Sequence, residues 1–264
     1  MPVGEVRVDD AILHVEIEGT GEPVTVFAHG LTNSCMELAA FTPMVPGTKV
    51  RFCFRGHGHS STPEPGAFRY ADFARDLDTV ASRTGATRAV GTSLGAGALA
   101  HLLEREPDRF ERLVFLLPAA LEGPIGPSPI FERTAELLET LPRDEAIEAI
   151  LQGSGRARSY ETQPGLREFD LLLWQDMNPI GVARAIREVV HAAAVTGLGA
   201  LATVQAPTLV IAREGDSIHP ASVARALAEA MPNAEAIVLG SEDDLMASIP
   251  MLVDRVSRFL AGSA

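Results

Sequence analysis

Short apolar runs that alternate with helical patterns constrain the fold of this chain most strongly. Four of the runs are apolar at nearly every position, which is typical of strands buried on both faces: Val24–Ala28, Val50–Phe54, Leu113–Leu117 and Pro207–Ala212. Shorter or alternating runs predict further strands at Val6–Val8, Ala11–Glu18, Arg88–Val90 and Glu235–Leu239. Helical patterns lie between them at Tyr70–Arg83, Leu94–Arg105 and Ala221–Ala230, and an amphipathic pattern at Ile249–Leu260 closes the chain. The alternation predicts an α/β fold with a mostly parallel sheet sandwiched by helices.

The middle of the chain departs from this alternation. It opens with a cluster of glycine and proline between Gly123 and Pro129, and no strand-like run follows. Instead it contains four helical stretches, at Phe131–Glu139, Asp144–Gln152, Arg167–Trp174 and Gly181–Val195. We therefore expect residues 1–121 and 199–264 to form one core and residues 122–198 to form an inserted helical lid.

Charge and composition exclude several classes of function. The 264 residues include 22 basic and 35 acidic side chains, and the formal net charge of −13 argues against a nucleic-acid or anionic-membrane partner. No apolar run approaches the roughly 18 residues of a membrane span, and Met1–Asp10 lacks the apolar region of a signal peptide. We thus expect a cytoplasmic protein with no nucleic-acid or membrane partner. Cys35 and Cys53 form no CxxC motif, and no metal, nucleotide or flavin motif stands out, so we expect no metal and no cofactor. The oligomeric state stays open.

One segment carries the strongest chemical signal. Gly91-Thr92-Ser93-Leu94-Gly95 has the pattern GxSxG and joins a strand-like run to a helical one. This setting is typical of a nucleophile elbow, in which a strained turn exposes the serine hydroxyl and flanking glycines allow close packing. The pattern predicts Ser93 as a nucleophile; the alternative is a glycine-rich turn with a bystander serine.

A histidine–glycine pair follows the run that ends at Ala28. Gly30 lets the backbone bend so that an amide faces the site. The backbone amides of Leu31 and Leu94 are then candidates for an oxyanion hole, a pair of donors that stabilises a tetrahedral intermediate. We expect His29 to support this loop.

Two further motifs follow predicted strands. Arg55-Gly56-His57-Gly58-His59-Ser60 contains two histidines two positions apart, but the segment itself holds no cysteine or carboxylate, so a structural turn is favoured over a metal site. Asp216 follows the run Pro207–Ala212, and the carboxyl end of a parallel strand lies at the same edge of the sheet as Ser93. Asp216 is therefore a candidate to orient a base, with a turn or helix-capping aspartate as the alternative.

Taken together, the HG, RGHGHS, GTSLG and GDSIHP segments occur in the order and spacing of the α/β-hydrolase superfamily, and the chain resembles its lid-bearing serine esterases and hydrolases. The resemblance covers nearly the whole chain, and the lid matches least. It implies an eight-stranded, mostly parallel sheet, Ser93 as nucleophile, Asp216 as triad acid and oxyanion amides from Leu31 and Leu94. Many members have an Asp–Leu pair before the arginine of the RGHGHS-like stretch; here Cys53-Phe54 stands there.

A second departure concerns the triad histidine, which the family places in the loop after the last strand. In this chain that loop reads Leu-Gly-Ser-Glu-Asp-Asp-Leu over residues 239–245, and no histidine follows His219. The expected position falls on or near Asp243. The resemblance thus implies that the usual proton acceptor for Ser93 is missing.

Three hypotheses follow from that departure. In the first, the protein is an atypical serine hydrolase of an ester, thioester or lactone of a small organic substrate, since the resemblance to lid-bearing members implies an apolar pocket between lid and sheet. Its base is Glu242 or Asp243, or a histidine borrowed from His29, His57, His59 or His219. An unperturbed carboxylate is about 2.5 pKa units weaker as a base than imidazole, or about 3 kcal/mol, and crowding with Asp216 would offset part of this deficit. His219 lies only three residues beyond Asp216, so an unusual loop is needed for it to reach Ser93.

The other two hypotheses give the pocket a different role. One is a non-hydrolytic enzyme, such as a cyclase or lyase, whose oxyanion hole stabilises an enolate. The other is a non-catalytic protein that binds a small molecule on the same fold. Fold alone does not choose among the three. The stretch around Trp174 is a candidate lining for the substrate pocket, although core packing between lid helices is the favoured interpretation.

Overall fold

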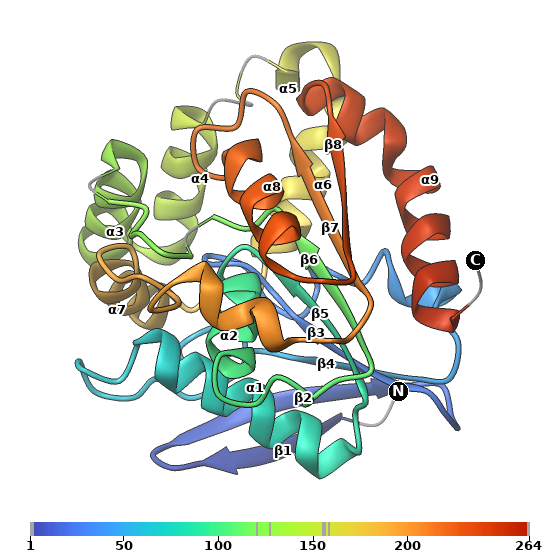
Figure 1. The fold of residues 1–264 in the computed structure, drawn as a ribbon. Helices are drawn as coiled ribbons and strands as arrows, with labels where there is room; N and C mark the ends of the chain where they lie inside the picture. Colours follow the sequence, from blue (N-terminus) through green and yellow to red (C-terminus); the bar gives the residue numbers. More distant parts are fainter. Residues whose placement is uncertain (1–2, 120, 127, 155–156, 158, 263–264) are drawn as a thin grey trace.

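An eight-stranded sheet forms the centre of the protein (Figure 1). The computed structural model describes residues 3–119, 121–126, 128–154, 157 and 159–262. The strand order is β1-β2-β4-β3-β5-β6-β7-β8. The strands are β1 Val3–Val8, β2 Ala11–Glu18, β3 Val24–Ala28, β4 Thr48–Phe52, β5 Arg88–Thr92, β6 Arg112–Leu116, β7 Thr208–Arg213 and β8 Ala234–Leu239. Strands β1, β2 and β4 pair antiparallel and all other neighbours pair parallel, which confirms the expected fold class.

Helices cover both faces of the sheet. The core helices are α1 Tyr70–Thr84, α2 Leu94–Leu103, α8 Ala221–Ala230 and α9 Glu242–Ala261, and the 3-10 turns are η1 Thr42–Met44 and η2 Leu198–Thr203. Alternate residues of the parallel strands point to opposite faces: Leu113 and Phe115 of β6 pack into one hydrophobic cluster, and Val114 packs into the other. Helices α1, α2 and α8 contribute to the first cluster and α9 to the second, so the near-continuous apolar runs reflect burial on both sides.

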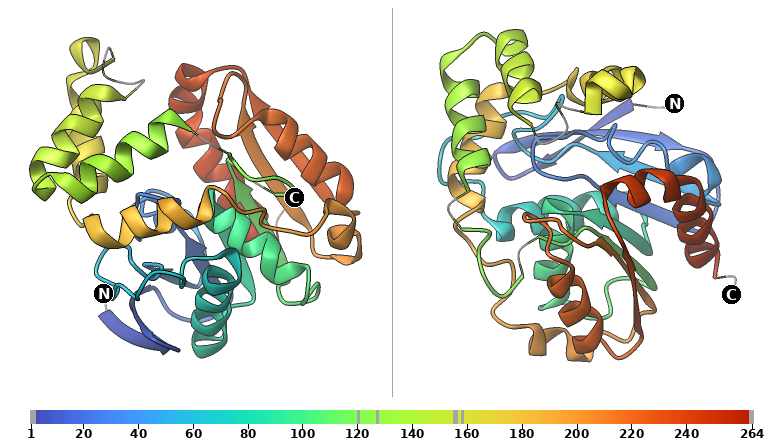
Figure 2. Two further views of the ribbon diagram at one scale, coloured as in Figure 1. Left: turned by 90° about the vertical axis from the view of Figure 1, so that its left-hand side faces the viewer. Right: turned by 90° about the horizontal axis from the view of Figure 1, so that it is seen from above.

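The helices inserted between β6 and β7 group together at one side of the sheet (Figures 1 and 2). They are α3 Pro129–Thr140, α4 Arg143–Gly153, α5 Ser159–Thr162, α6 Pro164–Trp174 and α7 Pro179–Val189. Helix α3 packs along α7, and α4 contacts both α3 and α6. Among the described residues between β6 and β7 there is no strand, in agreement with the predicted change of pattern.

Several boundaries differ from the sequence-based expectation. Helix α7 ends at Val189 rather than Val195, and α5 carries no periodic signal because it is a single turn. Helix α9 starts at Glu242, well before the expected Ile249, because the Ser241 hydroxyl caps it by accepting the amide N–H of Asp244. No helix in the described part of the chain is long and apolar enough to cross a membrane.

Candidate active site

Ser93 occupies a sharp turn between β5 and α2. Its backbone has φ 48° and ψ −103°, a combination that L-residues rarely adopt and that persists only where the surroundings enforce it. The enforcing contacts are on neighbouring strands: the Ser93 amide donates to the carbonyl of Leu116, and the Gly95 amide donates to the carbonyl of His29. The GxSxG segment therefore forms the strained strand–turn–helix connection that its sequence predicts.

The two glycines of this turn are required by close backbone approach. A Cβ atom on Gly95 would lie 2.2 Å from the carbonyl oxygen of Ala28, and one on Gly91 would lie 2.6 Å from the carbonyl oxygen of Gly95. Backbone atoms cannot move away as a side chain can, so only glycine allows α2 to begin this close to β3.

The Ser93 hydroxyl has an imidazole partner. Oγ of Ser93 lies 3.0 Å from Nε2 of His219, and Nδ1 of His219 lies 3.1 Å from Oδ2 of Asp216. With the proton on Nδ1, the ring donates to the carboxylate and accepts the serine proton at Nε2. Hydroxyl, imidazole and carboxylate are thus aligned for a proton transfer away from Ser93.

The turn after β7 explains how His219 reaches the serine. Gly215 adopts φ +73°, which reverses the chain at the end of the strand. Oδ1 of Asp216 then accepts the amides of Ile218 at 2.9 Å and of His219 at 3.0 Å, a local side-chain-to-backbone turn of the kind aspartate favours. This turn brings the His219 imidazole back to the Asp216 carboxylate and directs its Nε2 to Ser93.

Among the alternatives that the sequence left open for the base, the contact favours a histidine borrowed from outside the usual loop. No histidine follows the last strand, as the sequence indicates, but an Asp216-centred turn delivers His219 from the loop after β7 instead. The loop that the sequence analysis regarded as unusual is a compact turn held by two backbone hydrogen bonds.

The two alternative bases proposed from the sequence occupy the first turn of α9. The backbone of Glu242 and Asp243 is helical. Their side chains lie outside the described residues, and no contact with Ser93 is assigned to them.

Asp216 is held in its ionised form. Burial alone would raise the pKa of its carboxyl group, but the His219 side chain and the amides of Ile218 and His219 more than offset this and keep the pKa well below its usual range. Arg213 adds an ion pair at 2.9 Å to the same oxygen that faces the imidazole. A permanently charged Asp216 fixes the ring and stabilises an imidazolium.

The two predicted oxyanion donors flank the serine. Leu94 begins α2 directly after Ser93, where a helix amide has no intrahelical acceptor, and Leu31 follows Gly30 at the end of β3. Within the described residues neither amide has a hydrogen-bond acceptor. Leu31 lines the cavity that contains Ser93, and Leu94 follows Ser93 directly in the chain.

His29 supports this loop, as expected. It is fully buried, donates from Nδ1 to the carbonyl of Gly30 at 2.7 Å, and accepts the Phe54 amide at Nε2. Burial, and to a smaller extent the neighbouring His57, lowers the pKa of His29 to about 3, so the ring is neutral. Its two hydrogen bonds connect the segments that follow β3 and β4.

The RGHGHS segment forms a structural turn. The His57 ring hydrogen bonds the carbonyl of Arg55, and burial lowers the pKa of His57 to about 4. Arg55 makes a two-pronged ion pair with buried Asp76 of α1 at 2.7 and 2.9 Å. His59 is exposed and lies 3.4 Å from Asp176. None of these side chains contacts Ser93, which supports the turn interpretation of this motif.

A cavity of about 630 Å³ opens above Ser93 and His219. Its walls combine the Gly30 loop, the elbow and the inserted helices, and most of the lining is apolar: Leu31, Leu117, Ile130, Phe131, Leu137 and Ile150. Trp174 lines it as well as packing against the hydrophobic core. This size and character suit a small or medium organic molecule.

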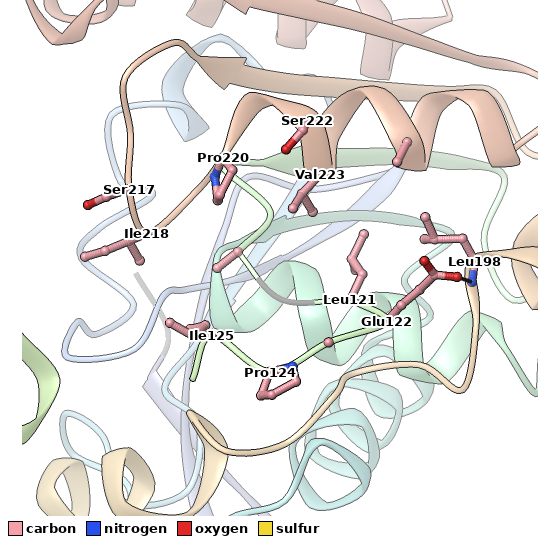
Figure 3. Close-up of a pocket in the computed structure, with 13 residues that line it drawn as sticks. Leu121, Glu122, Pro124, Ile125, Leu198, Ser217, Ile218, Pro220, Ser222 and Val223 are labelled. Carbon is pink, nitrogen blue, oxygen red and sulfur yellow. Dashed lines mark hydrogen bonds between the residues drawn. The ribbon is translucent and has the colours of Figure 1, made fainter. Parts of the chain in front are cut away.

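A second cavity of about 440 Å³ lies against the same turn (Figure 3). Ile218 lines both cavities, whereas Ser93 and His219 line only the first. Glu122 borders the second cavity and accepts the amide of Leu198. Of these two cavities, Ser93 and His219 therefore face the one that the inserted helices also line.

Comparison with known proteins agrees with the observed fold. The family model described as "alpha/beta hydrolase fold" matches residues 50–244. The chain belongs to the alpha/beta hydrolase family. No curated protein matches it by sequence.

Solved alpha/beta hydrolase-fold structures superpose over the whole chain. A hydrolase from Pseudomonas aeruginosa is 24% identical, with 99% of this chain and 98% of that chain covered and a TM-score of 0.79. The enol-lactonase from Burkholderia xenovorans is 22% identical, with 98% and 100% covered and a TM-score of 0.81. A thermophilic esterase from Thermogutta terrifontis is 20% identical, with 98% and 97% covered and a TM-score of 0.74. At these identities the likeness shows the fold.

The site of this alpha/beta hydrolase also contains an acidic residue that the sequence did not predict. Glu37 follows the Gly30 loop and lines the Ser93 cavity. Its Oε2 accepts the Gly30 amide at 2.6 Å, and its Oε1 accepts Nδ2 of Asn33 at 2.7 Å. No motif marks Glu37, because its contact with the Gly30 amide depends on how the loop folds back. The one sequence feature that could have indicated it is a single carboxylate shortly after the predicted oxyanion loop.

One group of side chains in this member of the alpha/beta hydrolase family resembles a metal site in composition. Potential ligand atoms of His14, Glu16 and Cys35 lie within 4.8 Å of one another. Glu16 is already paired with the Arg51 guanidinium at 2.8 Å and with His14 at 3.2 Å. None of the three lines the Ser93 cavity, so this group has no part in the chemistry there.

Proposed function

We propose that this protein hydrolyses a carboxylic ester, thioester or lactone of a small organic molecule, with Ser93 as the nucleophile. The observation that carries the proposal is the 3.0 Å contact between Oγ of Ser93 and Nε2 of His219, backed by the carboxylate of Asp216. A serine hydroxyl is a weak nucleophile until a neighbouring base accepts its proton, and this arrangement supplies that base.

The reaction proceeds in two halves. In the first, Oγ of Ser93 attacks the acyl carbon as its proton moves to His219, and the amides of Leu31 and Leu94 stabilise the oxyanion. The imidazolium then donates its proton to the departing alcohol or thiol, which leaves an acyl-serine. In the second half, His219 takes a proton from water, the hydroxide adds to the acyl carbon, and the returned proton restores Ser93 as the acid leaves.

In this mechanism the inserted helices act as a lid over the substrate. Residues of α3 and α4, including Phe131, Leu137 and Ile150, form the roof of the cavity. Their apolar side chains exclude water from the acyl group, and an opening of residues 122–198 would admit the substrate.

The competing hypotheses of an elimination enzyme and of a non-catalytic binding protein were motivated by a missing imidazole. The position of His219 removes that motive. Hydrolysis is therefore the function that the geometry supports best.

Labelling with a fluorophosphonate tests the proposal directly. The probe should react with Ser93, and labelling should disappear in Ser93→Ala and fall steeply in His219→Ala. Ser154 also lines the cavity, so Ser154→Ala is the matched control and should label like the wild type. Labelling that survives in Ser93→Ala, or none in the wild type, would contradict the proposal.

The substrate class is read from a second measurement. Hydrolysis of short-chain phenyl esters, acyl thioesters and γ-lactones should be detected for at least one class and should vanish in Ser93→Ala. Activity that persists without the serine but disappears when Glu242 and Asp243 are neutralised would instead favour the carboxylate-based alternatives.

A further inference from the structure

Glu37 places a carboxylate at the edge of the reacting group. A point one bond beyond Cα of Gly30, where a Cβ atom would lie, is 3.2 Å from Oε1 of Glu37 and 3.5 Å from Cβ of Ser93. Glu37 and Ser93 thus lie on the same side of Gly30, and both line the same cavity.

This carboxylate has no cationic partner. In the part of the chain that the structure describes, no basic side chain forms an ion pair with Glu37. The other titratable side chains on the cavity wall are His219, which is engaged with Ser93, and Arg133, which is paired with Glu136 at 2.8 Å. Burial raises the pKa of Glu37 to about 7, which is the response expected of a carboxylate without a counter-charge.

An unused acceptor lies beside it. Oδ1 of Asn33 is buried and has no hydrogen-bond partner among the described residues, although Nδ2 of the same amide donates to Glu37. Buried polar atoms without partners are uncommon in folded proteins and often await a ligand or water. The two oxygens of Glu37 and Oδ1 of Asn33 make three acceptors and no free donor.

We propose that Glu37 and Asn33 form a subsite for a protonated primary amine carried by the substrate close to its scissile carbonyl. An ammonium group has three N–H donors and one positive charge, so it matches both the acceptors and the missing counter-charge. The remaining wall is apolar and takes the hydrocarbon part. This inference rests on the proposed function because it assigns the amine to a substrate. The binding of the amine itself does not require turnover.

Binding is therefore measured in Ser93→Ala, in which the chemistry is absent. Pentylammonium and 1-pentanol share the same chain and differ in charge and donors, and their dissociation constants are compared by calorimetry at pH 8. We expect pentylammonium to bind at least about tenfold more tightly, the value of one good charge-assisted hydrogen bond. Equal binding of the two ligands would overturn the proposal.

Glu37→Gln in the same background tests the residue itself. Glutamine keeps the size and one acceptor for the Gly30 amide, so the preference for the amine should disappear while 1-pentanol binds as before. Glu122→Gln removes one carboxylate from the neighbouring cavity and should leave the preference intact (Figure 3). A preference that survives Glu37→Gln, or that is lost in Glu122→Gln, would place the amine elsewhere and refute the subsite.

A pH comparison covers the case in which Glu37→Gln does not fold. The amine stays protonated from pH 6 to pH 8, whereas the Glu37 carboxyl ionises across that interval. Pentylammonium should bind several-fold more tightly to Ser93→Ala at pH 8 than at pH 6, and 1-pentanol should not. Affinity for the amine that is independent of pH would contradict the role of Glu37. Failure of these tests leaves the fluorophosphonate result untouched, so the two proposals can fail separately.

Discussion

Asp216 and His219 occupy one turn, and the carboxylate of Asp216 lies 3.1 Å from Nδ1 of the His219 ring. The same carboxylate also accepts two amides of that turn, including the amide of His219 itself. The group that orients the imidazole therefore also shapes the backbone that carries it. Base and orienting acid are a single local unit delivered to a distant serine.

His219→Ala should abolish hydrolysis, because no other described side chain contacts the Ser93 hydroxyl as a base. We expect kcat to fall by a factor on the order of 10⁴ to 10⁶, as when triad members are removed in serine proteases. Steady-state kinetics on the best ester measures this. Glu242→Gln and Asp243→Asn serve as comparisons and should keep activity within a few-fold; a large loss there with an active His219→Ala would reverse the assignment.

Asp216→Asn should separate the two roles of the carboxylate. The asparagine oxygen can still accept the amides of Ile218 and His219, so the turn should survive and the melting temperature should change little. Its NH2 group then faces Nδ1 of His219 and favours the wrong tautomer, so kcat should drop by about 10⁴-fold. Circular dichroism and kinetics on the same sample check both halves, and a parallel loss of fold and activity would show that the turn itself fails.

Gly95→Ala should prevent the elbow from forming. The new Cβ would lie 2.2 Å from the Ala28 carbonyl oxygen, and neither backbone segment can retreat without breaking β3 or α2. We expect a loss of at least about 3 kcal/mol in the free energy of unfolding, or insoluble protein. In Gly199→Ala nothing lies within 4 Å of the new Cβ, so this control should change the stability by about 1 kcal/mol or less in urea unfolding.

Glu37 should make the stability of the protein depend on pH. Its folded-state pKa of about 7 lies above the ordinary value of 4.5, so between these values the folded state holds a proton that the unfolded chain releases. The contribution of Glu37 is thus most favourable below pH 4.5 and is lost as the pH rises toward 7, by up to about 3 kcal/mol. The free energy of unfolding of wild type and of Glu37→Gln is measured in urea at pH 5 and pH 8. Relative to Glu37→Gln, the wild type should be less stable at pH 8 than at pH 5. A constant difference would mean that Glu37 titrates normally.

The local parts of this site could be predicted from sequence. Strand Val24–Ala28 and helix Ala221–Ala230 have the bounds that their residue patterns indicate, because burial on both faces or on one stripe leaves a direct periodic signal. The elbow at Ser93 was likewise predictable, because the two glycines that allow its strained turn lie within the same five-residue motif.

The contact of His219 with Ser93 was not predictable in the same way. It joins positions 126 residues apart, and it depends on the path of one turn rather than on any periodicity. A signal did exist: glycine before aspartate, histidine three residues later and proline next is the pattern of an aspartate-centred turn that ends at a helix start. The contact of Glu37 with the Gly30 amide left no comparable trace, because an irregular loop sets its geometry.

The position of the imidazole also determines which strands can open locally without disturbing the contact between Ser93 and His219. β8 is the outermost strand of the sheet, and α9 follows it. His219 is anchored instead next to β7, an interior strand hydrogen-bonded on both sides. Because the Glu214 amide at the start of this turn donates to the carbonyl of Leu239 in β8, fraying of β8 should be uncoupled from turnover only while the β6–β7 pairing and the two Asp216 hydrogen bonds keep the turn in place.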